Sequence, residues 1–189
     1  TSKTSFVINN AIFDGNITNG TSGDGGAIEF YTGSSSTINS TIFKNNKAGS
    51  TASASSGRNG GATKGNGSCT IDFNNCIFYD NVAQYYSGAH VNWMDSGGSS
   101  TFDNCTFEGN RTYWSGGALG AYHGNITIKN SIIYNNLNGD GTSGYDMYDN
   151  GGGKITATNV IHRSSSSVTF SGTNSTSNPL FTDASSNDY

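Results

Sequence analysis

An eight-residue motif recurs along this chain and constrains its fold more than any other feature. The copies read "NNAIFDGN" (9–16), "NSTIFKNN" (39–46), "NNCIFYDN" (74–81), "DNCTFEGN" (103–110) and "KNSIIYNN" (129–136), and a degenerate sixth copy, "TNVIHRSS", follows at 158–165. A second motif lies in each interval, as in "GGAIEFY" (25–31) and "GGALGAYH" (116–123). The copies start 26 to 35 residues apart, a spacing typical of solenoid proteins, in which each repeat stacks on the next.

Aligned copies form columns of similar residues. The column of small residues contains Ala11, Thr41, Cys76, Cys105, Ser131 and Val160. Two positions later comes an aromatic column, Phe13, Phe43, Phe78, Phe107, Ile133 and His162, and three positions before the small column comes an apolar one, Ile8, Ile38, Phe73, Phe102, Ile128 and Ala157. Because side chains alternate between the two faces of a strand, the small and aromatic columns can point to one side. Together these columns predict an all-β fold, a right-handed parallel β-helix of about six coils, and Gly and Asn are too frequent for helices.

The last residue of each motif predicts a structural ladder. Its members are Asn16, Asn46, Asn81, Asn110 and Asn136, and the sixth copy places Ser165 at the equivalent position. Asparagine amides at one turn of stacked coils can hydrogen-bond to one another, and asparagine tolerates the left-handed backbone of tight turns. The ladder therefore explains why the motif repeats.

Composition and charge narrow the classes of partner. The chain has 189 residues, of which 32% are hydrophobic and 12% charged, and its net charge is −4 without a basic cluster. These values disfavour nucleic acid as a partner, and no apolar run is long enough for a membrane span. We expect a single β-helix domain over residues 1–189. The segment "SFVINN" (5–10) enters the repeat without a capping helix, which favours a piece of a longer helix or a subunit covered by another chain.

The motifs resemble those of a known group of proteins. "GGAI" (25–28), together with the F-x-x-N pattern at 13–16, 43–46, 78–81 and 107–110, resembles the paired motifs of polymorphic outer-membrane proteins. It is also similar to the wider class of right-handed β-helix surface proteins, including archaeal and bacterial adhesin-like proteins. The ending "NPLFTDASSNDY" (178–189) is similar to a segment that often closes such helices. The resemblance implies a β-helix at the cell surface, although such repeats also occur in autotransporter passengers and polysaccharide-active enzymes.

The cysteines and glycosylation sequons give further expectations. Cys69, Cys76 and Cys105 suit neither a disulfide framework nor a zinc site, and we expect Cys76 and Cys105 to be free, buried thiols one coil apart, at roughly 4.8 Å. Several asparagines precede x-Ser/Thr and are candidate glycosylation sites. The ladder predicts no glycan on Asn16 or Asn110, nor on Asn104 beside a turn. The better acceptors are Asn19, Asn39, Asn66, Asn125 and Asn174.

The sequence does not predict a catalytic or metal site, and no cofactor is expected. A β-helix glycosidase would need carboxylates within about 5–10 Å of one another. The outward column after the aromatic positions reads Asp14, Lys44, Tyr79, Glu108, Tyr134 and Arg163, and its two acids are three coils apart, roughly 14 Å. Three acids in "NGDGTSGYDMYDNGG" (138–152), namely Asp140, Asp146 and Asp149, could offer oxygens to calcium, but solvated turn residues are the favoured interpretation. His90, His123 and His162 have no evident catalytic partner in the sequence, which favours structural roles.

Aromatic residues supply the candidate binding site. "QYYSGAHVNW" (84–93) and "RTYWSGGALGAYH" (111–123) occupy equivalent stretches of adjacent coils. The alignment predicts Tyr85 beside Trp114 and Trp93 beside Tyr122, with Tyr31 in the second column two coils earlier. Flat rings on the outside of a rigid rod could bind sugar rings or a partner protein. The alternative is that these rings pack under loops or cover the ends of the core.

Two outward columns raise other possibilities. Strict alternation directs Ile12, Ile42, Ile77, Thr106, Ile132 and Ile161 outward, as an apolar stripe typical of an interface. The alternative is that a bend at the turn or the loop 47–59 hides this stripe. A column of Thr37, Thr101, Thr127 and Thr156 is interrupted by Val7 and Asp72, which makes ice binding the least favoured function.

The sequence thus favours a non-catalytic extracellular or cell-surface module, adhesin-like or a subunit of a surface fibre. Its expected partners are like subunits or the rest of a longer chain, and glycans. Subunit contacts are expected at the first coil, around Phe6 to Asn16, because an open strand edge offers backbone donors and acceptors. The alternative is a polysaccharide-binding or polysaccharide-cleaving protein similar to pectate lyases.

Overall fold

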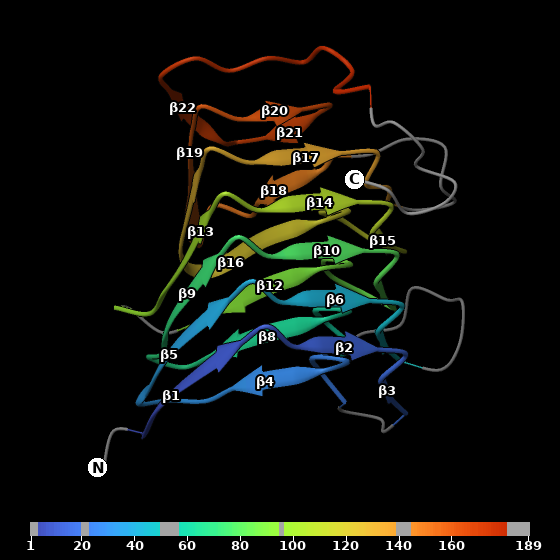
Figure 1. The fold of residues 1–189 in the computed structure, drawn as a ribbon, viewed down its shortest axis with the longest axis vertical. Helices are drawn as coiled ribbons and strands as arrows, with labels where there is room; N and C mark the ends of the chain where they lie inside the picture. The colour runs from blue at the N-terminus through green and yellow to red at the C-terminus, as the bar shows by residue number, and fades with distance from the viewer. Residues whose placement is uncertain (1–3, 20–22, 50–56, 95–96, 139–144, 181–189) are drawn as a thin grey trace.

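The fold is a parallel β-solenoid, which confirms the predicted class (Figure 1). The computed structural model describes residues 4–19, 23–49, 57–94, 97–138 and 145–180. Strands along these residues pair in parallel with the strands of the next coil, and like residues of the repeat lie opposite one another. The described residues contain no helix.

Each coil passes through up to four faces. The GGA face contains β4 (Ile28–Phe30), β8 (Thr63–Asn66), β12 (His90–Trp93), the start of β16 (Leu119–Lys129), β18 (Met147–Asp149) and β21 (Ser165–Ser166). The long face contains β1 (Thr4–Asn9), β5 (Ser34–Asn39), β9 (Thr70–Asn74), β13 (Ser99–Asp103), the end of β16, β19 (Gly153–Thr158) and β22 (Thr169–Ser171). The Phe face contains β2 (Ile12–Asp14), β6 (Ile42–Lys44), β10 (Ile77–Tyr79), β14 (Thr106–Glu108), β17 (Ile132–Tyr134) and β20 (Ile161–His162). The short face contains β3 (Ile17–Thr18), β7 (Lys47–Ala48), β11 (Val82–Ala83) and β15 (Arg111–Thr112).

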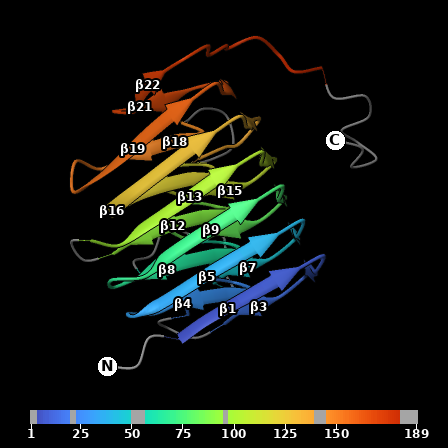
Figure 2. The same cartoon turned by 60° about the vertical axis from the view of Figure 1, so that its left-hand side comes forward.

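The chain winds upward as a right-handed helix. Figure 1 shows the strands of the Phe face at the front, running left to right, each above the previous one, while the GGA face returns behind them. Right-handed winding is the hand that twisted strands favour for parallel crossovers. The Phe face stacks six strands, which mark about five complete turns. Figure 2 shows the long face, whose strands lie side by side along the solenoid.

Left-handed backbone at two turns shapes each coil. Between the long and Phe faces, φ is +48° to +56° at Asn10, Ser40, Asn75, Asn104, Asn130 and Asn159. Directly before the ladder asparagine, φ is +52° to +68° at Gly15, Asn45, Asp80, Gly109 and Asn135. Glycine, asparagine and aspartate adopt this backbone more readily than other residues. The left-handed residue is therefore the neighbour of each ladder asparagine, and not the ladder residue itself.

The Gly-Gly motif is repeated because successive coils approach closely there. A Cβ atom on Gly26 would lie 2.1 Å from the carbonyl oxygen of Gly61, and one on Gly61 would lie 2.1 Å from that of Gly88. Contacts this short exclude any side chain at these positions. The second glycine of the motif thus sets the spacing of the coils at the entry to the GGA face.

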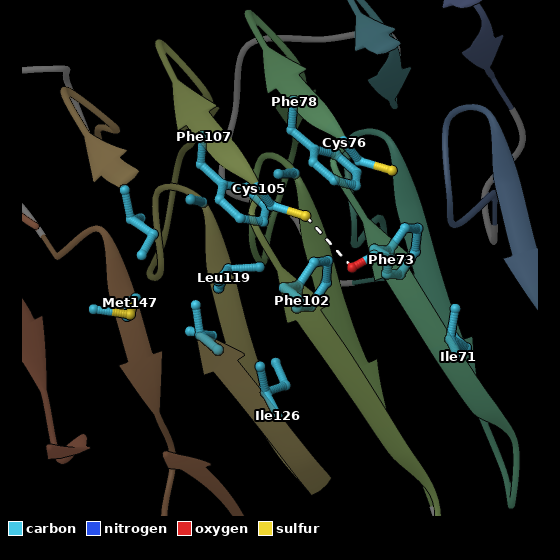
Figure 3. Close-up of a cluster of buried hydrophobic side chains, with 14 of the residues drawn as sticks. Ile71, Phe73, Cys76, Phe78, Phe102, Cys105, Phe107, Leu119, Ile126 and Met147 are labelled. Carbon is cyan, nitrogen blue, oxygen red and sulfur yellow. Dashed lines mark hydrogen bonds between the residues drawn. The ribbon is translucent and has the colours of Figure 1, made fainter. Parts of the chain in front are cut away.

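Aromatic rings of the Phe face stack in the interior, as predicted. The centroids of Phe43 and Phe78 are 4.8 Å apart and those of Phe78 and Phe107 are 4.9 Å apart, with interplanar angles of 7°. From the long face, Phe73 and Phe102 stack at 4.7 Å and meet the first column edge to face, at 5.4 Å between Phe73 and Phe78. Figure 3 shows the two columns facing each other. Such pairs contribute about 0.5–1.5 kcal/mol each beyond the burial of their surface.

The cysteines are free and buried, which confirms their predicted role as small core residues. Cys76 and Cys105 point inward between the phenylalanine columns (Figure 3). The Cys105 thiol donates a weak hydrogen bond to the Phe73 carbonyl at 3.5 Å, and burial raises the pKa of Cys105. A protonated, apolar thiol fits this position.

The predicted asparagine ladder is present and satisfies the amides of its interior members. The Nδ2 atom of Asn81 donates to Asn110 Oδ1 and to the Phe43 carbonyl, both at 2.9 Å. Its Oδ1 atom accepts from the Nδ2 and the backbone N–H of Asn46, at 2.9 and 3.0 Å. The same pattern runs from Asn16 to Asn136. These asparagines are buried except in the first coil, where Asn16 is exposed.

The ladder ends at Asp146, whereas Ser165, at the equivalent position of the sixth copy, pairs with Met147 on the GGA face. Asp146 Oδ1 accepts from the backbone N–H and Nδ2 of Asn136, at 2.9 and 3.2 Å. Its Oδ2 accepts from the backbone N–H groups of Arg163 and Ser164, at 2.7 and 3.0 Å. A carboxylate accepts hydrogen bonds but cannot donate them, so no further amide can follow. Burial raises the pKa of Asp146, and these N–H donors oppose the rise.

The ladder predicts a large cost for losing one interior amide. In Asn81→Ala, the Asn46 N–H and the Phe43 carbonyl would stay buried without their partners, and we expect a loss of about 2–4 kcal/mol in the free energy of unfolding. Denaturant unfolding measures this loss. The control Asn125→Ala changes an exposed strand position and should cost less than about 0.5 kcal/mol. Equal losses in the two variants would contradict a structural ladder.

The end of the ladder gives a second prediction. In Asp146→Asn, either orientation of the amide places its NH2 group against N–H donors, so we expect a loss of about 1–3 kcal/mol at neutral pH. The control is Asp72→Asn, which makes the same charge change on the outer side of the long face. Unfolding experiments that found Asp146→Asn as stable as this control would rule out the acceptor role.

Candidate functional site

The two acids of the outward Phe-face column do not converge. Strand register places Asp14, Lys44, Tyr79 and Glu108 on four successive coils, so the acids are three coils apart, as predicted. Asp14 forms an ion pair with Lys44 at 3.3 Å, whereas Glu108 is buried. Within the described parts of the chain, no three His, Cys, Asp or Glu residues are arranged to hold a metal ion.

The acids near residue 146 have structural contacts. Asp149 is buried, and its oxygens accept from the backbone N–H groups of Gly151 and Ile155, at 2.8 and 3.1 Å. Asp146 ends the ladder. The interpretation of these two as solvated turn residues was therefore wrong, and their oxygens already accept N–H donors. Asp140 lies outside the described residues.

A buried ion pair was missed by sequence reasoning. Lys64 on β8 is buried, contacts Asp24 and lies 3.7 Å from Glu29. Asp24 also accepts from the backbone N–H of Asn59 at 2.7 Å. The pair links adjacent coils, and the alignment of Glu29 with Lys64 on the GGA face was the sequence signal for it.

His90 belongs to a polar cluster inside the solenoid. Its Nδ1 lies 2.8 Å from Thr63 Oγ1 and its Nε2 lies 2.6 Å from Asn92 Oδ1. Ser100 donates to the same Asn92 oxygen at 2.8 Å. Because the Asn92 oxygen is an acceptor, His90 carries its proton on Nε2 and accepts from Thr63. Burial lowers the pKa of His90 to about 4, so its role is that of a neutral structural group.

His162 and His123 lie elsewhere. His162 is buried in the aromatic column, as predicted, and stacks on Phe170 with the ring centroids 4.7 Å apart. His123 is exposed and meets the edge of Trp93, with the ring centroids 5.6 Å apart. The three histidines therefore lie in three different environments.

The outer side of the GGA face carries the candidate binding site. Seven rings in contact with one another form what we call the aromatic cluster: Tyr85, Tyr86, Trp93, Trp114, Tyr122, Tyr145 and Tyr148. The predicted pairs are confirmed, because Tyr85 lies 5.4 Å from Trp114 and Trp93 lies 5.4 Å from Tyr122 between ring centroids. Tyr86, Tyr145 and Tyr148 were missed, although "SGYDMY" (143–148) aligns with the Gly-Gly-Ala motif.

A β-bulge places Tyr122 at the centre of the cluster. Strand β16 pairs Ala121 with Asn92 and His123 with Trp93, so Tyr122 is the extra residue between them. Such a bulge redirects a side chain. Gly120 makes room for Ser87, because a Cβ there would lie 2.2 Å from Ser87 Oγ, and it would only just contact the Tyr122 ring, at 3.4 Å.

The rings differ in their access to solvent. Tyr122 is only 2% exposed, since neighbouring rings cover it, and its hydroxyl pairs with Ser115 at 2.6 Å. Trp114 is 55% exposed, Tyr145 42% and Trp93 38%. Tyr122 therefore supports the cluster from below, and the exposed rings form its surface.

Polar groups surround the cluster, and Arg58 adjoins it, because its carbonyl accepts from the Tyr85 N–H at 3.0 Å. Asn138 donates to the Trp114 carbonyl at 3.2 Å, and the Tyr148 hydroxyl donates to Asn150 Oδ1 at 3.5 Å. Burial, with a hydrogen bond to Tyr85, raises the pKa of Tyr86 to about 12. This hydroxyl therefore stays protonated at neutral pH.

Tyr31 does not join the cluster surface. It is 61% exposed, and its hydroxyl donates to Glu29 at 2.9 Å. The register places Asn66 between the coil of Tyr31 and the coil of Trp93. Tyr31 thus lies two coils from Trp93, as predicted, but apart from the other rings.

The isoleucine stripe faces outward, as strict alternation predicts. Ile42, Ile77 and Ile132 lie in register on the outer side of the Phe face and are half-buried, and Ile12 is 64% exposed. The threonine column is also in register, with Val7 and Asp72 interrupting it. Neither column combines rings with a polar rim as the aromatic cluster does.

The ladder sequons differ in exposure. Asn110 is buried with both amide hydrogens bonded. Asn16 also donates to Asn46 at 2.8 Å but is exposed, and Asn104 is exposed at a left-handed turn. The structural reason against a glycan is therefore strongest at Asn110.

The sequons that were expected to be the better acceptors also differ in exposure and in hydrogen bonding. Asn19 and Asn125 are exposed, and Asn66 is half-buried. The amide nitrogens of Asn39 and Asn174 already donate hydrogen bonds, to an asparagine side chain at 2.8 Å and to a backbone carbonyl at 2.9 Å. Glycosylation stays a prediction, for Asn19 and Asn125 above all.

Comparison of this chain with protein-family models, with curated proteins and with solved structures gave no match. Among the described residues there is also no helix that could cross a bilayer.

The buried histidine predicts acid destabilisation. The pKa of His90 is about 4 in the folded chain against an ordinary 6.5, so the unfolded chain binds an extra proton between these values. Stability should therefore fall as pH drops through this window, by up to about 3 kcal/mol. Denaturant unfolding at neutral pH and at the acidic end of the window measures the loss.

His90→Gln is the matched variant for this prediction, because it removes the titration. Burial also lowers the pKa of His162, which acts in the same direction and remains in the variant. The pH dependence of His90→Gln should be much flatter than that of the parent chain. An unchanged dependence would contradict the role of His90.

Proposed function

We propose that this chain is a non-catalytic structural module of an extracellular or cell-surface protein, adhesin-like, that presents a binding surface on a rigid solenoid. The observation that carries the proposal is the aromatic cluster. Trp93, Trp114 and Tyr145 gather exposed rings on one side of the solenoid, and interfaces are enriched in such residues. The resemblance of the GGAI and F-x-x-N motifs to polymorphic outer-membrane and adhesin-like proteins supports the same function.

The regular stacking of the coils suits the presentation of such a surface. The asparagine ladder and the stacked phenylalanines run without interruption from coil to coil. A repeat protein held in this way presents an extended surface. Such a body suits a surface protein that must hold a binding site in a fixed place.

Polysaccharide cleavage is the less favoured alternative. Glycoside hydrolysis needs two carboxylates within about 10 Å of each other, whereas Asp14 and Glu108 are separated by two intervening coils. Asp146 and Asp149 accept backbone hydrogen bonds. Polysaccharide binding without cleavage remains compatible with the proposal.

Like subunits, or the rest of a longer chain, are the proposed partners at the first coil. Strands β1, β2 and β3 are each the last strand of their sheet among the described residues. Val7, Ile12 and Ile17 are more than half exposed there. Strand addition would satisfy such an edge.

The proposal predicts that the chain does not turn over polysaccharide. Incubation with polygalacturonate, pectin and xylan, with and without calcium, should release neither reducing ends nor unsaturated sugars, because Asp14 and Glu108 are three coils apart and Asp24 and Glu29 are paired with Lys64. A pectate lyase and a xylanase serve as positive controls. Turnover that disappears in Asp14→Asn or Glu108→Gln would overturn the proposal.

A further inference from the structure

We infer that the aromatic cluster binds an uncharged polysaccharide, whose sugar rings stack on Trp114, Trp93 and the tyrosines between them. This inference rests on the proposed function, because it names the ligand class of the proposed binding surface. Four features of the cluster support it.

The first feature is a continuous row of rings. The centroids of Trp114 and Tyr85 are 5.4 Å apart, those of Tyr85 and Tyr86 are 4.0 Å apart, and those of Tyr86 and Trp93 are 6.0 Å apart. The row therefore joins an exposed tryptophan on one coil to an exposed tryptophan on the preceding coil. A chain of linked sugars could contact several of these rings at once, whereas a single small ligand would need only one or two.

The second feature is preorganisation. The Trp93 ring stacks on Tyr122 with an interplanar angle of 14°, and the Tyr122 hydroxyl is fixed by Ser115 at 2.6 Å. Tyr86 packs on the same ring, with centroids 3.8 Å apart. Side chains that are already ordered lose little entropy when a ligand binds.

The third feature is the kind of group around the rings. The rings of the cluster contact one another, and His123 meets the edge of Trp93. Amides and hydroxyls such as Asn138 and Asn150 surround the rings. An apolar floor with a few polar groups at its rim suits the hydroxyls of a neutral sugar. The nearby cations already have partners, because Lys64 is paired with Asp24 and Glu29 and the guanidinium of Arg58 donates to Gln84.

The fourth feature is exposure beyond what packing requires. Tyr122 is covered, as packing alone would explain, but Trp114 is 55% exposed and Tyr145 is 42% exposed. Large rings gathered in one exposed patch are unusual on a surface without a partner. The row of exposed rings is therefore better explained by a ligand than by packing.

The two tryptophans make a direct test possible. The chain contains 2 Trp, and both belong to the cluster, so tryptophan fluorescence reports on this site. The probes are cellohexaose, xylohexaose, mannohexaose and laminarihexaose, with hexagalacturonate as the charged comparison. We expect a saturable change in fluorescence with at least one neutral probe and none with hexagalacturonate.

Variants locate the binding. Trp114→Ala should weaken binding of that probe about tenfold or more, as loss of one stacking ring does, and Trp114→Phe should restore most of the affinity. Tyr31→Ala is the matched control, because Tyr31 is a similarly exposed ring, at 61%, outside the cluster. Calorimetry measures affinity in all variants, and thermal melting checks that Trp114→Ala folds as the parent does.

The outcomes separate the inference from the proposed function. No fluorescence change with any neutral probe at millimolar concentration, binding of hexagalacturonate alone, or full affinity in Trp114→Ala would each overturn the inference. If Trp114→Ala does not fold, Trp114→Phe and Trp93→Phe decide in its place, and full affinity in both would overturn it. If the chain neither binds nor cleaves any probe, the inference fails and the proposed non-catalytic module stands. If the chain cleaves a polysaccharide, the proposed non-catalytic module fails, and the affinity of Trp114→Ala still decides whether the aromatic cluster is the binding site.

Discussion

The structure depends on hydrogen bonds between equivalent asparagine amides of successive coils. Asn81 uses both hydrogens of its amide nitrogen and accepts two hydrogen bonds on its oxygen. A buried amide is stable only when it is satisfied in this way. Every coil must therefore place its asparagine directly over the asparagine of the preceding coil. Insertions can occur only where the chain leaves this path, which explains why the loops vary in length while the motif does not.

The ladder also has a direction, since each amide nitrogen donates to the asparagine of the next coil. An acceptor-only group such as the Asp146 carboxylate therefore suits its end.

The narrow interior explains how a chain of low hydrophobicity folds. Only 32% of the residues are hydrophobic, but a coil needs few apolar side chains to fill its cross-section. Phe73 and Phe78 meet edge to face within one coil, and each stacks on its counterpart in the next. The repeat supplies the stacking partner, so each aromatic ring packs both within its own coil and against the next coil. A surface rich in Ser, Thr and Asn follows, because the outward positions do not take part in the core.

Repetition also decides what could be read from the sequence. The register of Phe43 with Phe78 and of Asn46 with Asn81 was predictable, because a column of like residues specifies its own neighbours. The role of Asp146 was not predictable, because this residue occupies the alanine position of the Gly-Gly-Ala motif and its side chain extends into the interior to the ladder. The burial of Tyr122 was also hidden, because it depends on one extra residue in a bulge. Sequence columns report interactions that every coil shares, and single contacts that break the pattern leave no such signal.

The departures from the repeat gather on one side of the solenoid. Trp93 lies opposite Asn66 and His123 of the adjacent coils, Tyr122 is inserted by the bulge, and Tyr145 takes the place of a close-packed glycine. Residues that break a local rule in an otherwise regular protein tend to lie at functional sites. Substitutions on the ladder or in the phenylalanine columns are opposed by the coils above and below, whereas the outer side of the GGA face has no such constraint. Outer residues of this face can therefore differ from coil to coil without disturbing the ladder, and the aromatic cluster occupies such positions.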